Sequence, residues 1–204
     1  METRGIGLVL DIGAGAGGFA ADLRGRGYGK RIVSLEPLRA RYAILRKNAL
    51  NDPEWETVQC ALGDKDGIVD MDVPQECMPL DELMSHDTAP FVSLNGRMCE
   101  DVVMSRISTL LPAFRMDREP VLVHINVPGR ERDILHGARS VIEDVSAFHI
   151  HVSLQHDASG ILTLDEMTRT MQTMTFECVA ITPGSMDPVT GTMRHASVTF
   201  ARSV

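Results

Sequence analysis

The chain has 204 residues, of which 44% are hydrophobic, and this is enough for one domain that buries its own core. With a formal net charge of −8 and no long run of Lys and Arg, nothing predicts the basic surface that nucleic acid requires, and no segment resembles a signal peptide or a membrane span. Four scattered cysteines form no Cys-x-x-Cys pair and are expected to be reduced, which favours a cytoplasmic location.

The first predicted elements are a strand, a glycine-rich turn and a helix. An apolar run over residues 8–10 ends at Asp11, residues 13–18 include four glycines, and residues 19–23 have helical character. A turn of this composition lets the backbone approach a ligand at the N-terminus of a helix. This arrangement is a recurring way to hold a nucleotide-like cofactor.

The second predicted strand covers residues 31–35 and ends at Glu36 and Pro37. An acid at the end of this strand is suited to accept hydrogen bonds from both hydroxyls of a ribose. Together, the glycine turn and Glu36 predict that the chain binds an adenosine-containing cofactor.

Three interpretations of the glycine turn remain open. Gly13, Gly15 and Gly18 satisfy the G-x-G-x-x-G pattern of a nicotinamide dinucleotide site, although this pattern alone is weak. Asp11 would repel the pyrophosphate of a dinucleotide, whereas it would attract the ammonium and sulfonium groups of S-adenosylmethionine, directly or through water. Charge therefore favours S-adenosylmethionine. The third interpretation is a turn that binds nothing, and it leaves the spacing of Glu36 to coincidence.

Regular elements continue after the second strand. The sequence predicts a helix over residues 38–49, a strand over residues 57–62 and a hairpin over residues 63–73. Residues 74–120 are expected to form an irregular excursion with a strand near residues 102–107. Loops of this length are usually lids or substrate walls.

Strands and helices alternate again beyond the excursion. The predicted elements are strands over 121–127, 148–154, 176–182 and 196–201, and helices over 131–143 and 164–175. This alternation predicts a single α/β domain over residues 1–204. Its sheet should be mainly parallel, with helices on both faces and one antiparallel strand at the end.

Several motifs resemble those of the FkbM-type S-adenosylmethionine-dependent methyltransferases. The resemblance covers the glycine turn, the Glu-Pro dipeptide at positions 36–37, the Ala-Leu-Gly-Asp-Lys-Asp-Gly stretch at 61–67 and, as a variant, residues 123–138. It implies a class I methyltransferase (Rossmann-like) fold with a seven-stranded sheet. It also implies that S-adenosylmethionine donates a methyl group to a hydroxyl of a small molecule, commonly a sugar or a natural product.

The resemblance assigns roles to individual residues. Asp11, Gly13, Ala14 and Gly15 would hold the methionine part of the cofactor. Glu36 and Pro37 would hold the ribose, and Ala61 and Leu62 would lie along the adenine.

The chain departs from the family pattern near the expected reaction centre. The family usually has Lys-Ile-Asp where this chain has His124-Ile125-Asn126, so an acid near the transferring methyl becomes an amide. The family also commonly has a Glu where this chain has His151. These departures keep a second interpretation open, in which a degenerate methyltransferase fold acts as a cofactor-binding or protein-interaction module without catalysis.

Polar side chains alternate with apolar ones on two strands that are expected to be neighbours. His124 and Asn126 share one face of the first strand, and His149 and His151 share one face of the second. The histidines are satisfied core or rim residues, or His151 or His124 accepts the proton of the acceptor hydroxyl, or they bind a metal. No ligand spacing supports a metal, so the candidate catalytic residues are His151, His124 and Asn126.

A partner is expected from the start of the sequence. Class I methyltransferases usually place a helix before the first strand, where it helps to cover the sheet. Only residues 1–5 precede that strand here, so we expect a homodimer partner, or another protein, to cover the surface left bare.

Overall fold

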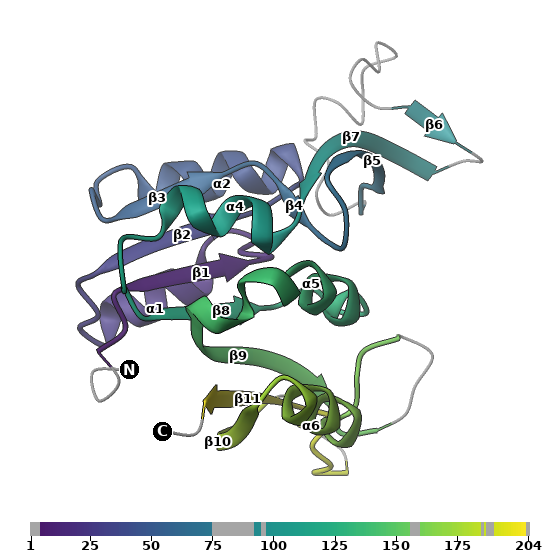
Figure 1. Cartoon of the computed structure of the whole chain (residues 1–204). Helices are drawn as coiled ribbons and strands as arrows, with labels where there is room; N and C mark the ends of the chain where they lie inside the picture. Colours follow the sequence, from purple (N-terminus) through teal and green to yellow (C-terminus); the bar gives the residue numbers. More distant parts are fainter. Residues whose placement is uncertain are drawn as a thin grey trace.

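The computed structural model describes residues 5–74, 92–94, 97–155, 160–184, 186 and 190–202. Its main element is a seven-stranded sheet in the order β10-β11-β9-β8-β1-β2-β3 (Figure 1). The strands are β1 (Leu8–Ile12), β2 (Arg31–Leu35), β3 (Trp55–Val58), β8 (Val121–Ile125), β9 (Val145–Ser153), β10 (Phe176–Pro183) and β11 (His195–Arg202).

Five neighbouring strands of this sheet, from β9 to β3, run parallel, whereas β11 is antiparallel to both β9 and β10. This confirms the predicted Rossmann-like sheet and its final antiparallel member. Because parallel strands end at the same edge of a sheet, the carboxyl ends of β1, β2 and β8 lie together. Ligands of open α/β sheets bind at such an edge.

Helices cover both faces of the sheet, and each face has its own apolar core. Helices α1 (Gly18–Gly25) and α2 (Arg39–Ala49) pack on the face to which Val9 of β1 points. Leu8, Leu10 and Ile12 of β1 point to the opposite face, which is covered by α4 (Ile107–Phe114), α5 (Glu131–Gly137), a 3₁₀ helix (Arg139–Asp144) and α6 (Leu164–Thr173). Side chains alternate along a strand, so β1 contributes to both cores.

A second, four-stranded sheet projects beyond the carboxyl end of the main one (Figure 1). Its strands are β4 (Ala61–Leu62), β5 (Gly67–Asp72), β6 (Val92–Leu94) and β7 (Arg97–Ser105), with β7 paired to the other three. The predicted strand over 57–62 is therefore wrong: the chain leaves the main sheet after Val58, and Ala61–Leu62 pair with β7. The expected hairpin over 63–73 does not form either: residues 67–72 are the single strand β5, and its antiparallel partner is β7.

Residues 97–114 correct the expectation of an irregular excursion over 74–120, because they form β7 and then α4; residues 102–105 of β7 belong to the strand expected near residues 102–107. The alternation of β7 is obscured by Glu100, whose buried carboxylate accepts a hydrogen bond of 2.7 Å from the backbone N–H of Arg39. Residues 75–91 of the excursion lie outside the described residues.

Asp66 joins the second sheet to α4. Its carboxylate accepts hydrogen bonds from the backbone N–H of Arg106 (3.0 Å), the hydroxyl of Ser105 (2.9 Å) and the hydroxyl of Thr109 (3.1 Å). The backbone N–H of Arg106 and the Ser105 hydroxyl hold the pKa of Asp66 well below its ordinary value. Asp66 thereby satisfies donors at the start of α4 and fixes the segment that leads from β4 to β5.

None of the helices in the described part of the chain has the length and apolar character that crossing a bilayer requires.

Candidate active site

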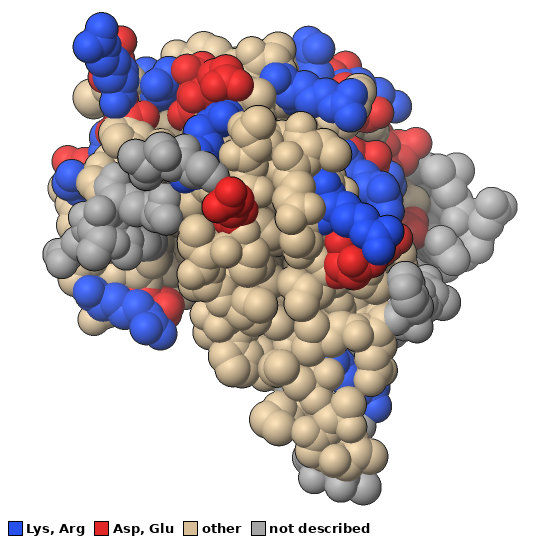
Figure 2. Space-filling model, turned by 60° about the horizontal axis from the view of Figure 1, so that its bottom comes forward, with Lys and Arg blue, Asp and Glu red and all other residues tan. Residues whose placement is uncertain are grey.

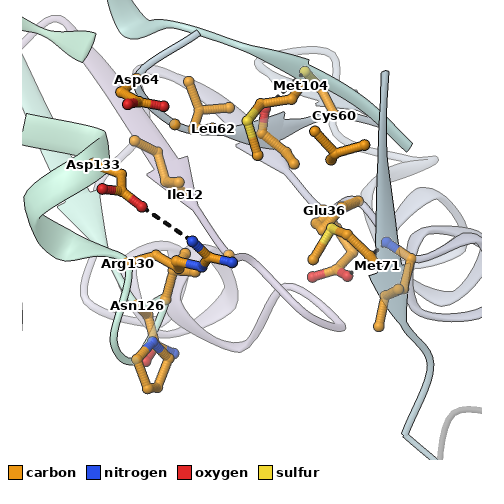
Figure 3. A pocket seen from close by; sticks show the side chains of 18 of the residues that line it. Ile12, Glu36, Cys60, Leu62, Asp64, Met71, Met104, Asn126, Arg130 and Asp133 are labelled. Atoms are coloured by element: carbon orange, nitrogen blue, oxygen red, sulfur yellow. Dashed lines mark hydrogen bonds and ion pairs between the residues drawn. The ribbon is translucent and has the colours of Figure 1, made fainter. Parts of the chain in front are cut away.

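A cavity of about 460 Å³ opens at the carboxyl ends of β1, β2 and β8 and is closed on its other side by the second sheet. The main sheet and its loops contribute Ile12, Gly13, Glu36, Pro37, Asn126 and Pro128. The second sheet contributes Ala61, Leu62, Val69, Met71 and Met104. Glu36 and Met71 lie at one side of the cavity, and Arg130 and Asp133 lie at the other (Figure 3).

The glycine turn packs tightly against the loop that follows β8. Gly13 has a left-handed φ of 74°, and a Cβ atom added there would lie 2.4 Å from the carbonyl oxygen of Asn126. The backbone N–H groups of Gly13 and Ala14 both donate to the carbonyl oxygen of Leu35, each at 3.0 Å. Position 13 therefore requires glycine, and the contact brings Asn126 to the edge of the cavity.

Glu36 is held between the turn and the start of α2. One carboxylate oxygen accepts the N–H of Gly15 at 2.9 Å, and the other accepts the N–H of Leu38 at 3.0 Å. Burial raises the pKa of Glu36, while the hydrogen bonds from Leu38 and Gly15 act in the opposite direction. Each oxygen keeps a lone pair for a further donor, and the side chain lines the cavity (Figure 3).

Asp11 lies beneath the turn and not in the cavity. Its carboxylate is fully buried, and it accepts a hydrogen bond of 2.8 Å from the hydroxyl of Ser34. Its other oxygen lies 2.8 Å from Nδ1 of His124. Asp11 was expected to attract the charged groups of the cofactor, but its nearest polar partners are Ser34 and His124 inside the protein.

The structure brings together some of the candidate residues and separates others. Of the expected cofactor-binding residues, those that line the cavity are Gly13, Glu36, Pro37, Ala61 and Leu62, while Ala14 and Gly15 form the adjoining turn. Asn126 also lines the cavity, whereas His124 and His151 are not among the described residues that do.

His151 lies on β9 and stacks against His195 of β11, with ring centroids 5.3 Å apart. Burial, and then the neighbouring His195, lower the pKa of His151, which favours its neutral form. Within the described ranges, no three His, Cys, Asp or Glu side chains converge to hold a metal ion.

Several cavity residues were missed by the sequence analysis. Met104 lies in the strand expected near residues 102–107 and Met71 in the expected hairpin, but no local signal showed which way either side chain faces. Cys60 lies beside them, and burial raises the pKa of its thiol to about 11, which keeps the thiol neutral. Arg130 and Asp133 form an ion pair of 3.2 Å at the rim, and their spacing on one helix turn is the only signal of that pair.

Residues 11–178 match the Methyltransferase FkbM domain. A search of the curated proteins found no match to this chain.

Solved structures share the fold at low sequence identity. One is the 1,6-didemethyltoxoflavin-N1-methyltransferase of Burkholderia thailandensis with bound S-adenosylhomocysteine, at 13% identity and a TM-score of 0.54, which covers 100% of this chain and 74% of that chain. Another is the magnesium protoporphyrin IX methyltransferase of Synechocystis with bound SAM, at 9% identity and a TM-score of 0.54, which covers 99% and 73%. These likenesses confirm the class I methyltransferase fold. Together with the domain match over residues 11–178, they complete the assignment: the chain belongs to the FkbM methyltransferase family.

Proposed function

We propose that this chain transfers a methyl group from S-adenosylmethionine to a hydroxyl of a small molecule, a sugar or a natural product. The observation that carries the proposal is Glu36, which two backbone N–H groups fix at the cavity with a lone pair free on each oxygen. Two adjacent ribose hydroxyls are the donors that such a carboxylate suits. Membership of a methyltransferase family sets the nicotinamide interpretation aside.

The rest of the cavity fits the other parts of the same cofactor. Leu62, Met71 and Met104 form an apolar wall beside Glu36, which suits the flat faces of an adenine. Gly13 and Asn126 line the opposite side of the cavity, where the methionine part would lie. S-adenosylmethionine supplies the methyl group, activated by its sulfonium charge.

Asn126 is the cavity residue best placed to orient the acceptor. Its amide oxygen can accept the hydrogen bond of the acceptor hydroxyl and thereby aim an oxygen lone pair at the methyl carbon, along the line of the carbon–sulfur bond that breaks. An amide cannot take up the hydroxyl proton at neutral pH, so the proton would pass to water while S-adenosylhomocysteine leaves as the neutral thioether. His124 and His151 do not line the cavity, so the proposal gives Asn126 a positioning role and assigns proton transfer to neither histidine.

Calorimetric titration with S-adenosylhomocysteine tests the cofactor site. We expect the wild-type chain to bind it and Glu36→Ala to weaken binding about 100-fold, because two hydrogen bonds to a charged group are lost. Glu56→Ala, on an exposed position of β3, is the matched control and should bind as the wild type does. Absence of binding by the wild-type chain at millimolar ligand would contradict the proposal.

A labelled methyl donor separates an active enzyme from the degenerate module. Incubation with fractionated small-molecule extract should transfer label to an acceptor, and the transfer should be lost in Glu36→Ala. A chain that binds S-adenosylhomocysteine but labels no fraction supports the alternative, a cofactor-binding or interaction module without catalysis.

We also propose that two copies associate through the side of the sheet that ends at β10. Figure 2 shows a broad area without charged side chains on the side where Figure 1 places β10, β11 and α6. Val179 and Ile181 of the edge strand β10 are exposed, and residues 178–183 carry no charge. A second copy that presents the same uncharged segment, residues 178–183, meets no like-charge repulsion along it and can satisfy the open backbone edge.

A further inference from the structure

A chain of buried hydrogen bonds crosses four strands of the main sheet beneath the glycine turn. The indole N–H of Trp55 on β3 donates to the hydroxyl of Ser34 on β2 at 2.9 Å, and that hydroxyl donates to Asp11 on β1 at 2.8 Å. Nδ1 of His124 on β8 completes the chain at 2.8 Å from the other oxygen of Asp11. All four side chains are buried.

The register of the sheet creates this arrangement. Asp11 is paired directly with Ser34 on one neighbouring strand and with His124 on the other. An ionised carboxylate only accepts hydrogen bonds, so Nδ1 of His124 carries the hydrogen that the pair shares. The bonding thus fixes both the tautomer and the orientation of the imidazole.

The same side chains contact the turn at both of its ends. Asp11 lies two positions before Gly13, where the turn begins, and is the second-last residue of β1. At the other end, a Cβ atom added to Gly17 would lie 2.7 Å from the indole of Trp55. Phe19, in the first turn of α1, stacks on His124 with ring centroids 3.7 Å apart and an interplanar angle of 17°. The hydrogen-bonded side chains therefore lie directly beneath the turn and support it. We call these four side chains the floor of the turn.

We propose that His124 is a positioning residue of the cofactor site, which holds the turn over residues 13–17 in its binding shape through Asp11 and Phe19. The inference rests on the proposed function, because the turn matters only if it holds S-adenosylmethionine. His124 acts through other residues and touches no part of the cavity. Trp55, the only tryptophan of the chain, lies at the far end of the same hydrogen bonds, so its fluorescence reports on the floor of the turn.

His149 provides a matched control on the neighbouring strand. Its ring lies 5.5 Å from that of His124, on the same face of the sheet, and its Nδ1 is 2.9 Å from the hydroxyl of Thr199. Burial lowers the pKa of His149 to about 4, so it is neutral at physiological pH. Its ring also stacks on Phe19, at a centroid distance of 5.6 Å against 3.7 Å for His124, but its hydrogen bond goes to Thr199, so it shares the surroundings of His124 without the bond to Asp11.

The test measures S-adenosylhomocysteine affinity by calorimetry and Trp55 emission by fluorescence in three variants. His124→Leu removes the donor, and we expect about a tenfold rise in Kd, which corresponds to about 1.4 kcal/mol. His124→Asn keeps a donor near the place of Nδ1, and it should stay within about threefold of the wild type, as should His149→Leu. Without ligand, Trp55 emission should shift in His124→Leu and not in His149→Leu.

The outcomes separate this inference from the proposed function. If the wild-type chain binds the ligand and His124→Leu binds it equally well, the positioning role is refuted and the methyltransferase proposal stands. If His124→Asn loses as much affinity as His124→Leu, the donor assignment is refuted. A wild-type chain that does not bind refutes both. Should His124→Leu fail to fold, Phe19→Leu removes the stacked ring instead, and unchanged affinity in that variant would also refute the role.

Discussion

Replacing Gly13 by alanine tests the contact that joins the turn to the loop after β8. The added Cβ would lie 2.4 Å from a backbone oxygen of Asn126 and 2.7 Å from Cγ2 of Val127. A backbone atom cannot rotate away, so the loop that carries Asn126 must move. Gly15→Ala is the control, because Gly15 also has a left-handed φ, of 57°, but has no atom within 4 Å of the added carbon.

The two variants differ by the cost of the clash alone. Left-handed backbone costs an alanine about 1–2 kcal/mol at either position. Overpacking adds about 1–3 kcal/mol at position 13. We therefore expect Gly13→Ala to lower the free energy of unfolding by about 3 kcal/mol and Gly15→Ala by about half as much.

Urea unfolding followed by far-ultraviolet circular dichroism measures both losses, and calorimetry with S-adenosylhomocysteine measures the effect on the site. Gly13→Ala should weaken binding beyond its effect on stability, because it displaces Asn126 at the cavity. Equal losses of stability in the two variants would show that the turn and the loop are not in contact, and the geometry of the cavity would then be wrong.

Three further predictions concern other parts of the molecule. Met71→Ala removes part of the apolar wall and should raise the Kd for S-adenosylhomocysteine about fivefold, whereas Ile68→Ala, on an exposed position of the same strand, should leave it unchanged. Because the pKa of Asp66 is lowered in the folded protein, its contribution to the free energy of unfolding is complete above about pH 4 and is lost as the pH falls towards that lowered pKa. Asp66→Asn has no such contribution to lose. Its urea midpoint should therefore fall less between about pH 5 and about pH 3 than that of the wild type. Light scattering at micromolar concentration should give the mass of a dimer for the wild type and of a monomer for Ile181→Lys, and a monomeric wild type would contradict the proposed association.

The sequence predicted the elements whose signals are local. β1 is a short run of buried residues followed directly by glycines, and Glu36 ends the next buried strand, so neighbouring residues were enough to find both. The helices were found from apolar residues that recur about every 3.6 positions, and the strands from short buried or alternating runs. The cavity lies where these local signals meet, which is why several of its residues were found from the sequence.

The remaining features depend on contacts between residues far apart in the chain. Ala61 pairs with Met104, 43 positions later, and no local pattern shows that this pair forms a wall of the cavity. Asp11 was expected to face the ligand, because the sequence does not show its true partner. That partner, His124, comes 113 positions later, and only the register of the sheet brings the two together. The strand expected near residues 102–107 found only the end of β7, because buried Glu100 breaks the apolar alternation before it and its partner is the backbone N–H of Arg39, far away in the sequence at the start of α2.

The place of β11 in the sheet sets the order in which the sheet can be completed. β11 follows β10 in the chain, yet it lies between β10 and β9, and β10 pairs with no other described strand. A nascent chain that has left the ribosome only as far as residue 194 can form the five parallel strands, but its β10 segment has nothing to join. Two strands are therefore added to the sheet in one late step, and during synthesis the apolar segment around Val179 and Ile181 is open to chaperones until β11 emerges.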